Sequence, residues 1–188
     1  MNYYNKKELK DIGFKKIGKN VLISKKASIL KPEKIEIGNN TRIDDFALLY
    51  GSINIGSNVH ITPMCLIGAG NTNIRISDFC TLAYGVKIFS QTDDYLDGYM
   101  TGSTVDKDLK RDICKKIVLE KFVIVGANSV IFPGCLLKEG TAVGACSLLN
   151  KNTKPWSVYY GTPAKFKKKR KKILINNIQN NLRSLKNK

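Results

Sequence analysis

The chain has 188 residues, a formal net charge of +17 and 43% hydrophobic residues, a composition typical of one globular domain and not of a disordered chain. Its single histidine excludes a zinc site built from three imidazoles of one chain, and five cysteines without a CxxC pair argue against a disulfide framework. No apolar run approaches the ~18 residues of a membrane span, and no signal peptide pattern precedes the first charged residues. We therefore expect a cytoplasmic protein that binds no metal.

The positive charge lies at the two ends of the chain. Residues 1–34 carry ten lysines against three acidic residues, and residues 165–188 carry ten basic and no acidic residues. Between them, residues 35–164 hold 12 basic and 12 acidic residues and are neutral. Basic ends attract phosphorylated small molecules, nucleic acid or an anionic membrane surface, although such charge is about as often only a solvated face.

The first predicted element is an N-terminal segment, residues 1–16, with a short helix over residues 5–11. Residues 17–160 then carry an internal repeat, because aliphatic residues recur every six positions. After a weaker start, the regular positions are Ile37, Ile43, Leu49, Ile55, Ile61, Ile67, Ile76, Leu82, Ile88, Leu119, Val125, Ile131, Leu137, Val143 and Leu149. A small or β-branched residue stands four positions after most of these, as at Thr41, Ala47, Val59, Cys65, Cys80, Val86, Val123, Ser129, Cys135, Thr141 and Ser147.

A period of six fits neither a 3.6-residue helix nor an alternating hairpin. It fits a short strand with a turn at each corner of a triangular prism, so that three hexads make one coil and the coils stack at the ~4.8 Å strand spacing. The aliphatic residue points into the prism and the small residue fills the corner. We therefore expect Cys65, Cys80 and Cys135, and Cys146 beside them, to belong to the core.

Two segments depart from the repeat. Residues 89–118 keep no register, are polar with several aromatic residues, and are predicted to form a loop extruded from one corner of a coil. Residues 161–188 are predicted to form a basic turn followed by a C-terminal α-helix from residue 164. Its apolar face consists of Leu174, Ile178, Leu182 and Leu185.

The run Tyr160-Gly161-Thr162-Pro163-Ala164-Lys165 follows the last hexad directly. Together with the hexads and the long loop, it resembles the acyl-coenzyme A-dependent acetyltransferases of the hexapeptide-repeat superfamily. The branch resembled is that of the galactoside and maltose O-acetyltransferases and the acetyltransferases of surface-polysaccharide clusters. This resemblance implies an all-β, left-handed parallel β-helix, a homotrimer with active sites between neighbouring subunits, and acetyl-CoA as co-substrate.

Carried over by position, the resemblance also implies a set of cofactor-binding residues. They are Ala127, Ala145, Asn150, Lys151, Lys165 and Lys168. The two last lysines are independently reasonable, because lysines after a turn of fixed geometry can neutralise the phosphates of the cofactor. The two alanines suit a pantetheine arm that approaches the backbone closely, but they equally suit a small corner residue.

The sequence departs from this family at the catalytic position. The family's sugar acetyltransferases carry a histidine on the extruded loop, whereas residues 90–95 of this chain contain none. We expect His60, at an outward position of its hexad, to act as the general base, with Asp93 or Asp94 orienting it or replacing it. The expected acceptor pocket consists of Thr62, Tyr84, Gln91 and Tyr95.

The function expected from these residues is direct transfer of an acetyl group from acetyl-CoA to a sugar hydroxyl, in the biosynthesis of surface polysaccharide or lipopolysaccharide. N-acetylation of an amino sugar is the first alternative. The second is a non-catalytic trimeric scaffold whose basic tails bind RNA or membrane. The enzyme is expected to bind no nucleic acid, and its basic tail gives it a route to the inner face of the membrane.

Overall fold

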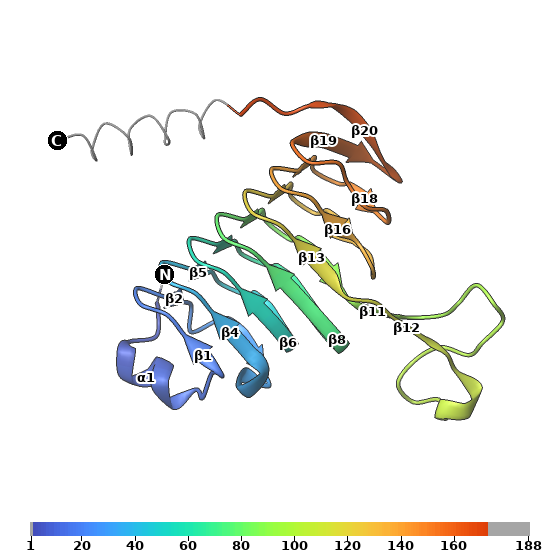
Figure 1. Cartoon of the computed structure of the whole chain (residues 1–188). Coiled ribbons are helices and arrows are strands. Elements are labelled where there is room, and N and C mark those ends of the chain that lie inside the picture. Colours follow the sequence, from blue (N-terminus) through green and yellow to red (C-terminus); the bar gives the residue numbers. More distant parts are fainter. Residues whose placement is uncertain (1, 173–188) are drawn as a thin grey trace.

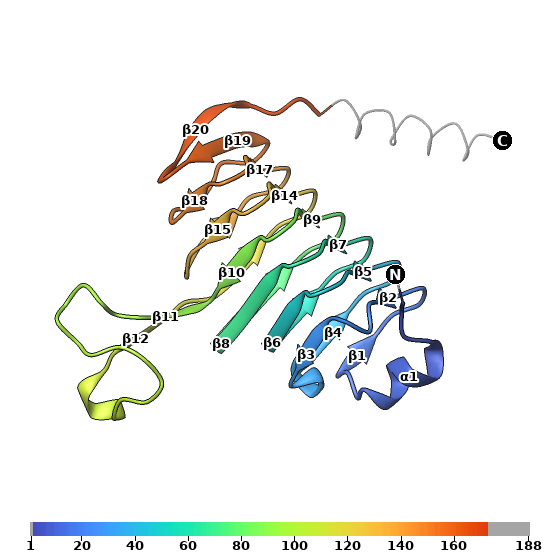
Figure 2. The same cartoon turned by 180° about the vertical axis from the view of Figure 1, so that it is seen from behind.

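In the computed structural model, which describes residues 2–172, the chain winds into stacked coils that form a three-sided prism (Figures 1 and 2). The coils form a left-handed parallel β-helix of about seven turns, which confirms the predicted fold class. The short helix α1 (Lys6–Asp11) precedes the first coil. Asn5 caps it by accepting the backbone N–H groups of Lys7 and Glu8, as expected for a helix that begins there.

Each coil passes three faces in the same order. The first face contains β1 (Lys16–Ile17), β4 (Ile35–Ile37), the second halves of β6 (Leu48–Ile55) and β8 (Leu66–Ile76), β13 (Ile117–Leu119) and β16 (Leu136–Leu137). The second face contains β2 (Leu22–Ile23), β5 (Arg42–Ile43), β7 (His60–Ile61), β9 (Thr81–Leu82), β14 (Ile124–Val125), β17 (Ala142–Val143) and β19 (Ser157–Gly161). The third face contains β3 (Ser28–Leu30), the first halves of β6 and β8, β10 (Lys87–Phe89), β15 (Val130–Ile131) and β18 (Leu148–Leu149).

Three corners separate these faces and are named here by their order along the chain. The first corner joins the first and second faces, at residues such as 38–41, 56–59 and 138–141. The second corner joins the second and third faces, at residues 44–47, 62–65, 83–86, 126–129 and 144–147. The third corner joins the third face to the first face of the next coil, at residues such as 51–52, 69–73 and 132–135, and it lies opposite the second face.

The core is the stack of aliphatic and small residues that the six-residue period predicts. Every aliphatic position of the regular hexads is buried, and so are all of the small positions from Thr41 to Ser147. Burial of one such aliphatic side chain stabilises the fold by about 1.5–3 kcal/mol. The prism is therefore held together by apolar contacts that repeat from coil to coil.

The cysteines divide into buried and exposed groups. Cys65, Cys80 and Cys135 are buried, as predicted, and burial raises the pKa of Cys80 to about 12 and that of Cys135 to about 11. The prediction for Cys146 is wrong, because this residue is exposed. It precedes the inward Ser147 and has a left-handed backbone (φ 54°), which leaves its side chain outside the corner.

The predicted extruded loop is an arm that leaves the third corner after β10 and returns at β13 (Figures 1 and 2). Its stem is the antiparallel pair β11 (Gln91–Asp93) and β12 (Asp112–Cys114), and a short 3₁₀ helix, η2 (Lys107–Leu109), lies beyond it. A second 3₁₀ helix, η1 (Pro32–Lys34), lies at the third corner of an earlier coil. The arm is thus partly ordered by strand pairing, which the sequence does not predict.

The prediction of a helix from residue 164 is wrong for its first residues. Ala164–Lys169 form β20, which pairs antiparallel with β19. An unpaired β19 would leave a row of open backbone groups at the end of the sheet, and β20 covers them. The apolar face predicted at Leu174, Ile178, Leu182 and Leu185 lies outside the described residues. Within residues 2–172, no helix is long and apolar enough to cross a membrane.

Two leucines of the second face test this packing. Leu82 on β9 is fully buried, whereas Leu22 on β2 is 43% exposed. We expect Leu82→Ala to lower the free energy of unfolding by about 2–5 kcal/mol, because it leaves a cavity, and Leu22→Ala to lower it by less than about 1 kcal/mol. Urea denaturation at one fixed protein concentration measures both values, and equal losses would contradict the inward register.

Candidate active site

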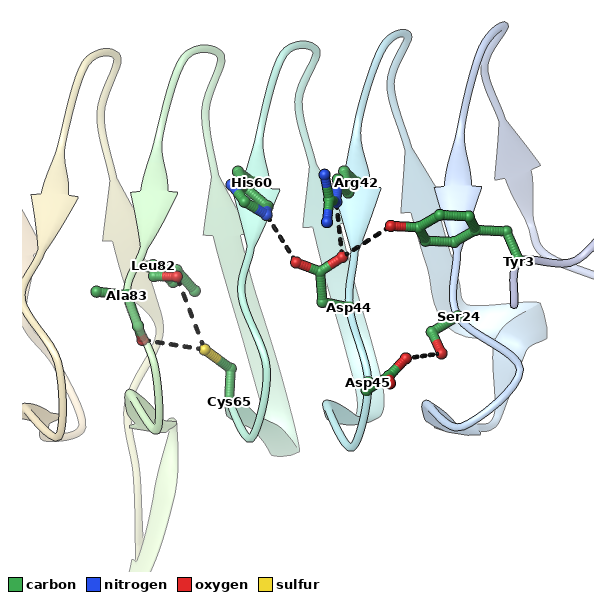
Figure 3. Close-up of polar contacts among 9 residues, drawn as sticks. All are labelled: Tyr3, Ser24, Arg42, Asp44, Asp45, His60, Cys65, Leu82 and Ala83. Carbon is green, nitrogen blue, oxygen red and sulfur yellow. Dashed lines mark hydrogen bonds and ion pairs between the residues drawn. The ribbon is translucent and has the colours of Figure 1, made fainter. Parts of the chain in front are cut away.

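His60 lies on β7 of the second face, beside the fully buried Ile61. Its Nε2 atom is 2.8 Å from Oδ2 of Asp44 (Figure 3). A carboxylate can only accept, so Nε2 carries the proton of this hydrogen bond and Nδ1 is the proton acceptor when the ring is neutral. Nδ1 has no hydrogen-bond partner among residues 2–172, and the side chain is 41% exposed, so an outside group can reach it.

Asp44 is buried in the second corner and is surrounded by donors (Figure 3). Besides the bond from His60, it accepts Nε of Arg42 at 2.7 Å and the hydroxyl of Tyr3 at 3.3 Å. Burial by itself raises the pKa of Asp44, but the hydrogen bonds from Arg42 and His60 outweigh burial and hold the pKa below its usual value. The carboxylate therefore stays ionised and fixes the orientation of the imidazole ring.

The two loop aspartates contact other partners. Asp93 on β11 pairs with Nζ of Lys110 at 2.9 Å, and Asp94 accepts Nε of Arg111 at 2.7 Å. These hydrogen bonds, from Lys110 and Arg111 respectively, hold the pKa of each carboxyl below its usual value. Ionised carboxylates of this kind are weak bases but good anchors for a cationic or donor group. The group that orients His60 in this chain is thus Asp44, and the loop aspartates brace the arm.

His60 and the arm do not face one another within one chain. His60 lies on the second face, and the arm leaves the third corner, which is opposite that face. The views from both sides show the arm projecting away from the prism (Figures 1 and 2). A site that contains both His60 and the arm therefore requires the arm of another copy of the chain.

The second corner carries a column of three equivalent residues on successive coils. Leu82 pairs with Val125, and Val125 pairs with Val143, so Tyr84, Ala127 and Ala145 occupy equivalent positions on three successive coils. The backbone N–H groups of these three residues make no hydrogen bond to any part of residues 2–172. In the preceding coil the equivalent residue is Pro63, which has no N–H group. The second corner therefore offers a row of backbone donors that ends at Tyr84.

The predicted cofactor residues do not all line one cavity. Ala127 and Ala145 lie at the second corner, whereas Asn150, Lys151 and Lys165 line one cavity beside β20, of about 330 Å³. The cavity is completed by Leu149, Asn152, Tyr159, Pro163, Ala164 and Phe166. Lys168 lies further along β20, opposite Val158, and does not line the cavity.

The predicted acceptor residues do not gather in one chain. Thr62 is buried at the second corner and its hydroxyl has no hydrogen-bond partner among the described residues, whereas Tyr84 is 62% exposed at the same corner. Tyr95 is exposed and lines a small cavity at the base of the arm. Gln91 braces the arm, since its side chain accepts the N–H of Asn71 at 2.8 Å and donates to Asp112 at 2.7 Å.

Sequence reasoning missed Asp44, Arg42 and Tyr3. The available signal was Asp44 itself, a carboxylate one residue after the inward Ile43, where other coils have Ser24, Thr62 or Ala83. No group of three or more His, Cys, Asp or Glu side chains within residues 2–172 is arranged to hold a metal ion.

No protein-family model matches the chain. It is 35% identical over 178 residues to a dTDP-4-amino-4,6-dideoxy-D-glucose acyltransferase of Escherichia coli, over 93% of this chain and 92% of that protein. Its structure is similar to that of AntD, an N-acyltransferase from Bacillus cereus in complex with dTDP and 3-hydroxybutyryl-CoA, with a TM-score of 0.94 and 40% identity over 99% of this chain and 100% of the other. A galactoside O-acetyltransferase of Lactococcus lactis is 25% identical over 128 residues, 61% of this chain and 62% of that protein.

The low pKa of Asp44 predicts how stability depends on pH. Because the pKa is lower in the folded chain, the ionised carboxylate stabilises the fold above its unfolded pKa, and this contribution is lost as the pH falls through the folded pKa. We expect Asp44→Asn to flatten the loss of unfolding free energy between about pH 5 and pH 2. Urea denaturation at a series of pH values measures this slope.

Asp45→Asn is the matched control, since it removes the neighbouring carboxylate, which accepts a hydrogen bond from Ser24 and contacts neither Arg42 nor His60. If the free energy of unfolding of Asp44→Asn fell with pH in parallel with that of the wild type over this range, the ionised Asp44 would not stabilise the fold.

Proposed function

Since this chain belongs to the hexapeptide-repeat family of acyltransferases, we propose that it transfers an acyl group from a coenzyme A thioester to the amine of a sugar carried on dTDP. The observation that carries the proposal is the likeness to AntD, an N-acyltransferase, over nearly the whole of both chains. The Escherichia coli relative, named for an amino sugar on dTDP, points to the same acceptor class. No relative named above supports the alternative of a non-catalytic scaffold.

The amine takes precedence here over the hydroxyl that the sequence favours. A galactoside O-acetyltransferase matches the chain at lower identity and over less of its length than the amino-sugar relative does. An amine is also the better nucleophile, and it needs a base only to take up the proton that it releases. A single general base on an exposed face is therefore sufficient for N-acylation.

The second corner is the proposed track of the acyl donor. Lys165 and Lys168 after the Thr162–Pro163 turn neutralise the phosphates, and the pantetheine arm runs past Ala145 and Ala127. Their small side chains let the arm approach the unpaired N–H groups. Three coil spacings separate this turn from Tyr84, or about 15 Å at ~4.8 Å per coil. Because Pro63 ends the row of donors, the thioester carbonyl lies at Tyr84.

The proposed reaction is a direct transfer. The amine nitrogen attacks the thioester carbonyl, and the N–H group of Tyr84 stabilises the oxyanion that forms. The intermediate collapses as the carbon–sulfur bond breaks, and the amide nitrogen loses one proton to Nδ1 of His60. That proton is then available to the departing thiolate, so an amine and a thioester become an amide and a free thiol. Asp44 keeps the imidazole in the tautomer that accepts the proton.

A neighbouring copy of the chain completes the proposed site. The exposed side chains of Phe46, Met64 and Tyr84 form an apolar strip along the second corner, and Tyr95 and Leu96 are exposed on the arm. Contact between this strip and the arm of a neighbour would bury both apolar surfaces. It would also bring the loop aspartates of the neighbour toward His60, as in the homotrimer expected from the sequence.

A direct comparison of acceptors tests the proposed function. Purified protein is incubated with acetyl-CoA or 3-hydroxybutyryl-CoA and either dTDP-4-amino-4,6-dideoxyglucose or dTDP-glucose, and release of free thiol is followed. We expect kcat/KM for the amine to exceed that for the hydroxyl sugar by at least about 100-fold, about 2.7 kcal/mol of transition-state free energy. Preferred acylation of the hydroxyl sugar would restore O-acylation as the function.

Removal of the base should slow turnover and leave donor binding intact. We expect His60→Gln to lower kcat about 10²- to 10⁴-fold, the range of general-base catalysis, with KM for the acyl-CoA nearly unchanged. Thr81→Ala is the control, because Thr81 pairs with His60 in the next coil and is given no role in the reaction. Full turnover by a folded His60→Gln enzyme would rule out His60 as the base.

The proposed donor track predicts which cysteine is protected by the donor. Cys146 is exposed beside Ala145 at the second corner, and Cys114 is exposed on β12 of the arm. We expect saturating acetyl-CoA, which has no free thiol to consume the reagent, to slow iodoacetamide alkylation of Cys146 at least about tenfold and to change Cys114 little, since only Cys146 adjoins the track. Mass spectrometry of peptides measures both rates in one sample, and equal protection of the two cysteines would place the donor elsewhere.

A further inference from the structure

One cavity takes no part in the site described above. It lies at the third corner, on the N-terminal side of the arm, and its volume of about 420 Å³ is within the usual range for a small-molecule site. Its lining consists of Lys31, Lys34, Tyr50, Gly51, Ser52, Ala69, Gly70, Asn71 and Thr72.

The charge of this cavity is positive and unbalanced. Lys31 and Lys34 are exposed, and neither forms an ion pair with any of residues 2–172. No carboxylate is among the lining residues. Lys31 also has a left-handed backbone (φ 58°), an uncommon conformation for a residue with a side chain, and η1 follows it directly. Two free ammonium groups among the lining residues of a cavity are suited to a diphosphate.

The rest of the cavity is suited to a nucleobase and a sugar. Tyr50 supplies an aromatic ring, which packs so closely over Gly68 that a Cβ atom there would lie 2.6 Å from it. Ser52, Asn71 and Thr72 supply hydroxyl and amide groups that can form hydrogen bonds with the polar groups of a nucleobase or sugar. At Gly51 (φ 84°) a Cβ atom would lie 1.7 Å from the carbonyl oxygen of Ala69, so the floor of the cavity requires glycine.

The cavity adjoins the arm directly. The side chain of Gln91, the first residue of β11, accepts the N–H group of Asn71 from the cavity wall. The proposed donor track occupies the C-terminal coils, so the acceptor must approach the reacting carbonyl from the N-terminal side. The cavity lies on that side, on the same coils as His60, because residues 51–52 and 69–73 precede and follow it by less than one coil. If copies of the chain pack side by side, the coil that carries the cavity in one copy lies at the height of the coil that carries His60 in the next.

A second basic cavity fits a nucleotide less well. It lies at the first corner and is lined by Lys154, Trp156, Lys169, Arg170 and Lys172, among others. The indole of Trp156 already has Arg170 and Lys172 over its ring, and Glu139 adds a negative charge to the wall. No residue of the arm lines this cavity.

We propose that the cavity at the third corner binds the nucleoside diphosphate of the acceptor. Lys31 and Lys34 neutralise the diphosphate, and Tyr50 packs against the nucleoside, which leaves the amino sugar free to extend toward the arm. This assignment rests on the proposed function, since it names where the dTDP of the acceptor is held.

Calorimetric titration of the full chain with dTDP tests the assignment. We expect Lys31→Ala/Lys34→Ala to raise the Kd for dTDP at least about tenfold, because two charge-assisted contacts are lost, and to leave the Kd for CoA unchanged. Thr72→Trp fills the cavity without removing charge and should weaken dTDP binding as well. Lys154→Ala/Lys172→Ala, at the first corner, is the charge-matched control and should bind dTDP as the wild type does.

The outcomes separate this assignment from the proposed function. Pyrophosphate should compete with dTDP in the wild type and not in Lys31→Ala/Lys34→Ala, which would support the diphosphate contact. Loss of dTDP binding in the first-corner control alone would overturn the assignment. Unchanged dTDP binding in Lys31→Ala/Lys34→Ala, with acyl transfer intact, would overturn it and leave the function standing. A wild-type chain that neither binds dTDP nor acylates an amino sugar would overturn both.

Discussion

The structure depends on the limited space inside a triangular coil. Each face contributes one aliphatic side chain to the interior, and each corner admits only a small or β-branched residue, so that every regular position of the hexads from Thr41 to Leu149 is buried. Coils that obey this rule stack at the strand spacing and bury one continuous apolar core. Any residue that does not fit must point outward or leave the prism. The outward side chains and the arm are therefore the parts of the chain that can bind ligands or react.

Stacking also decides which outward residues can act together. Residues one coil apart, such as Tyr84 and Ala127, are neighbours although more than forty positions separate them in the chain. The same rule joins Arg42 to His60 on the second face. By contrast, the arm and His60 are separated by the width of the prism, because a corner and its opposite face never meet. The proposed active site therefore belongs to an assembly of copies, with the donor track on one copy and the arm on the next.

The charged residues of the second face form one local arrangement. Asp44 is buried and ionised, and it accepts hydrogen bonds from His60, Arg42 and Tyr3. A buried carboxylate is stable only with such hydrogen-bond donors. The contacts that stabilise Asp44 therefore also hold the imidazole ring in its orientation. Tyr3 links this arrangement to the segment that precedes the first coil, and the N-terminal segment thereby takes part in orienting the proposed base.

The sequence by itself determined the parallel β-helix, the extruded arm, the N-terminal helix and the burial of Cys65, Cys80 and Cys135, because a six-residue period specifies burial directly. It also indicated an acyltransferase through the turn after the last hexad. Only the tertiary structure decided that Asp44 orients His60 and that residues 164–169 pair with β19 as a strand. It alone brought Lys31 and Lys34 together with residues 50–52 and 69–72. These contacts join different coils or cover a sheet edge, and the period of one strand carries no information about which side chain lies beside it in the next coil.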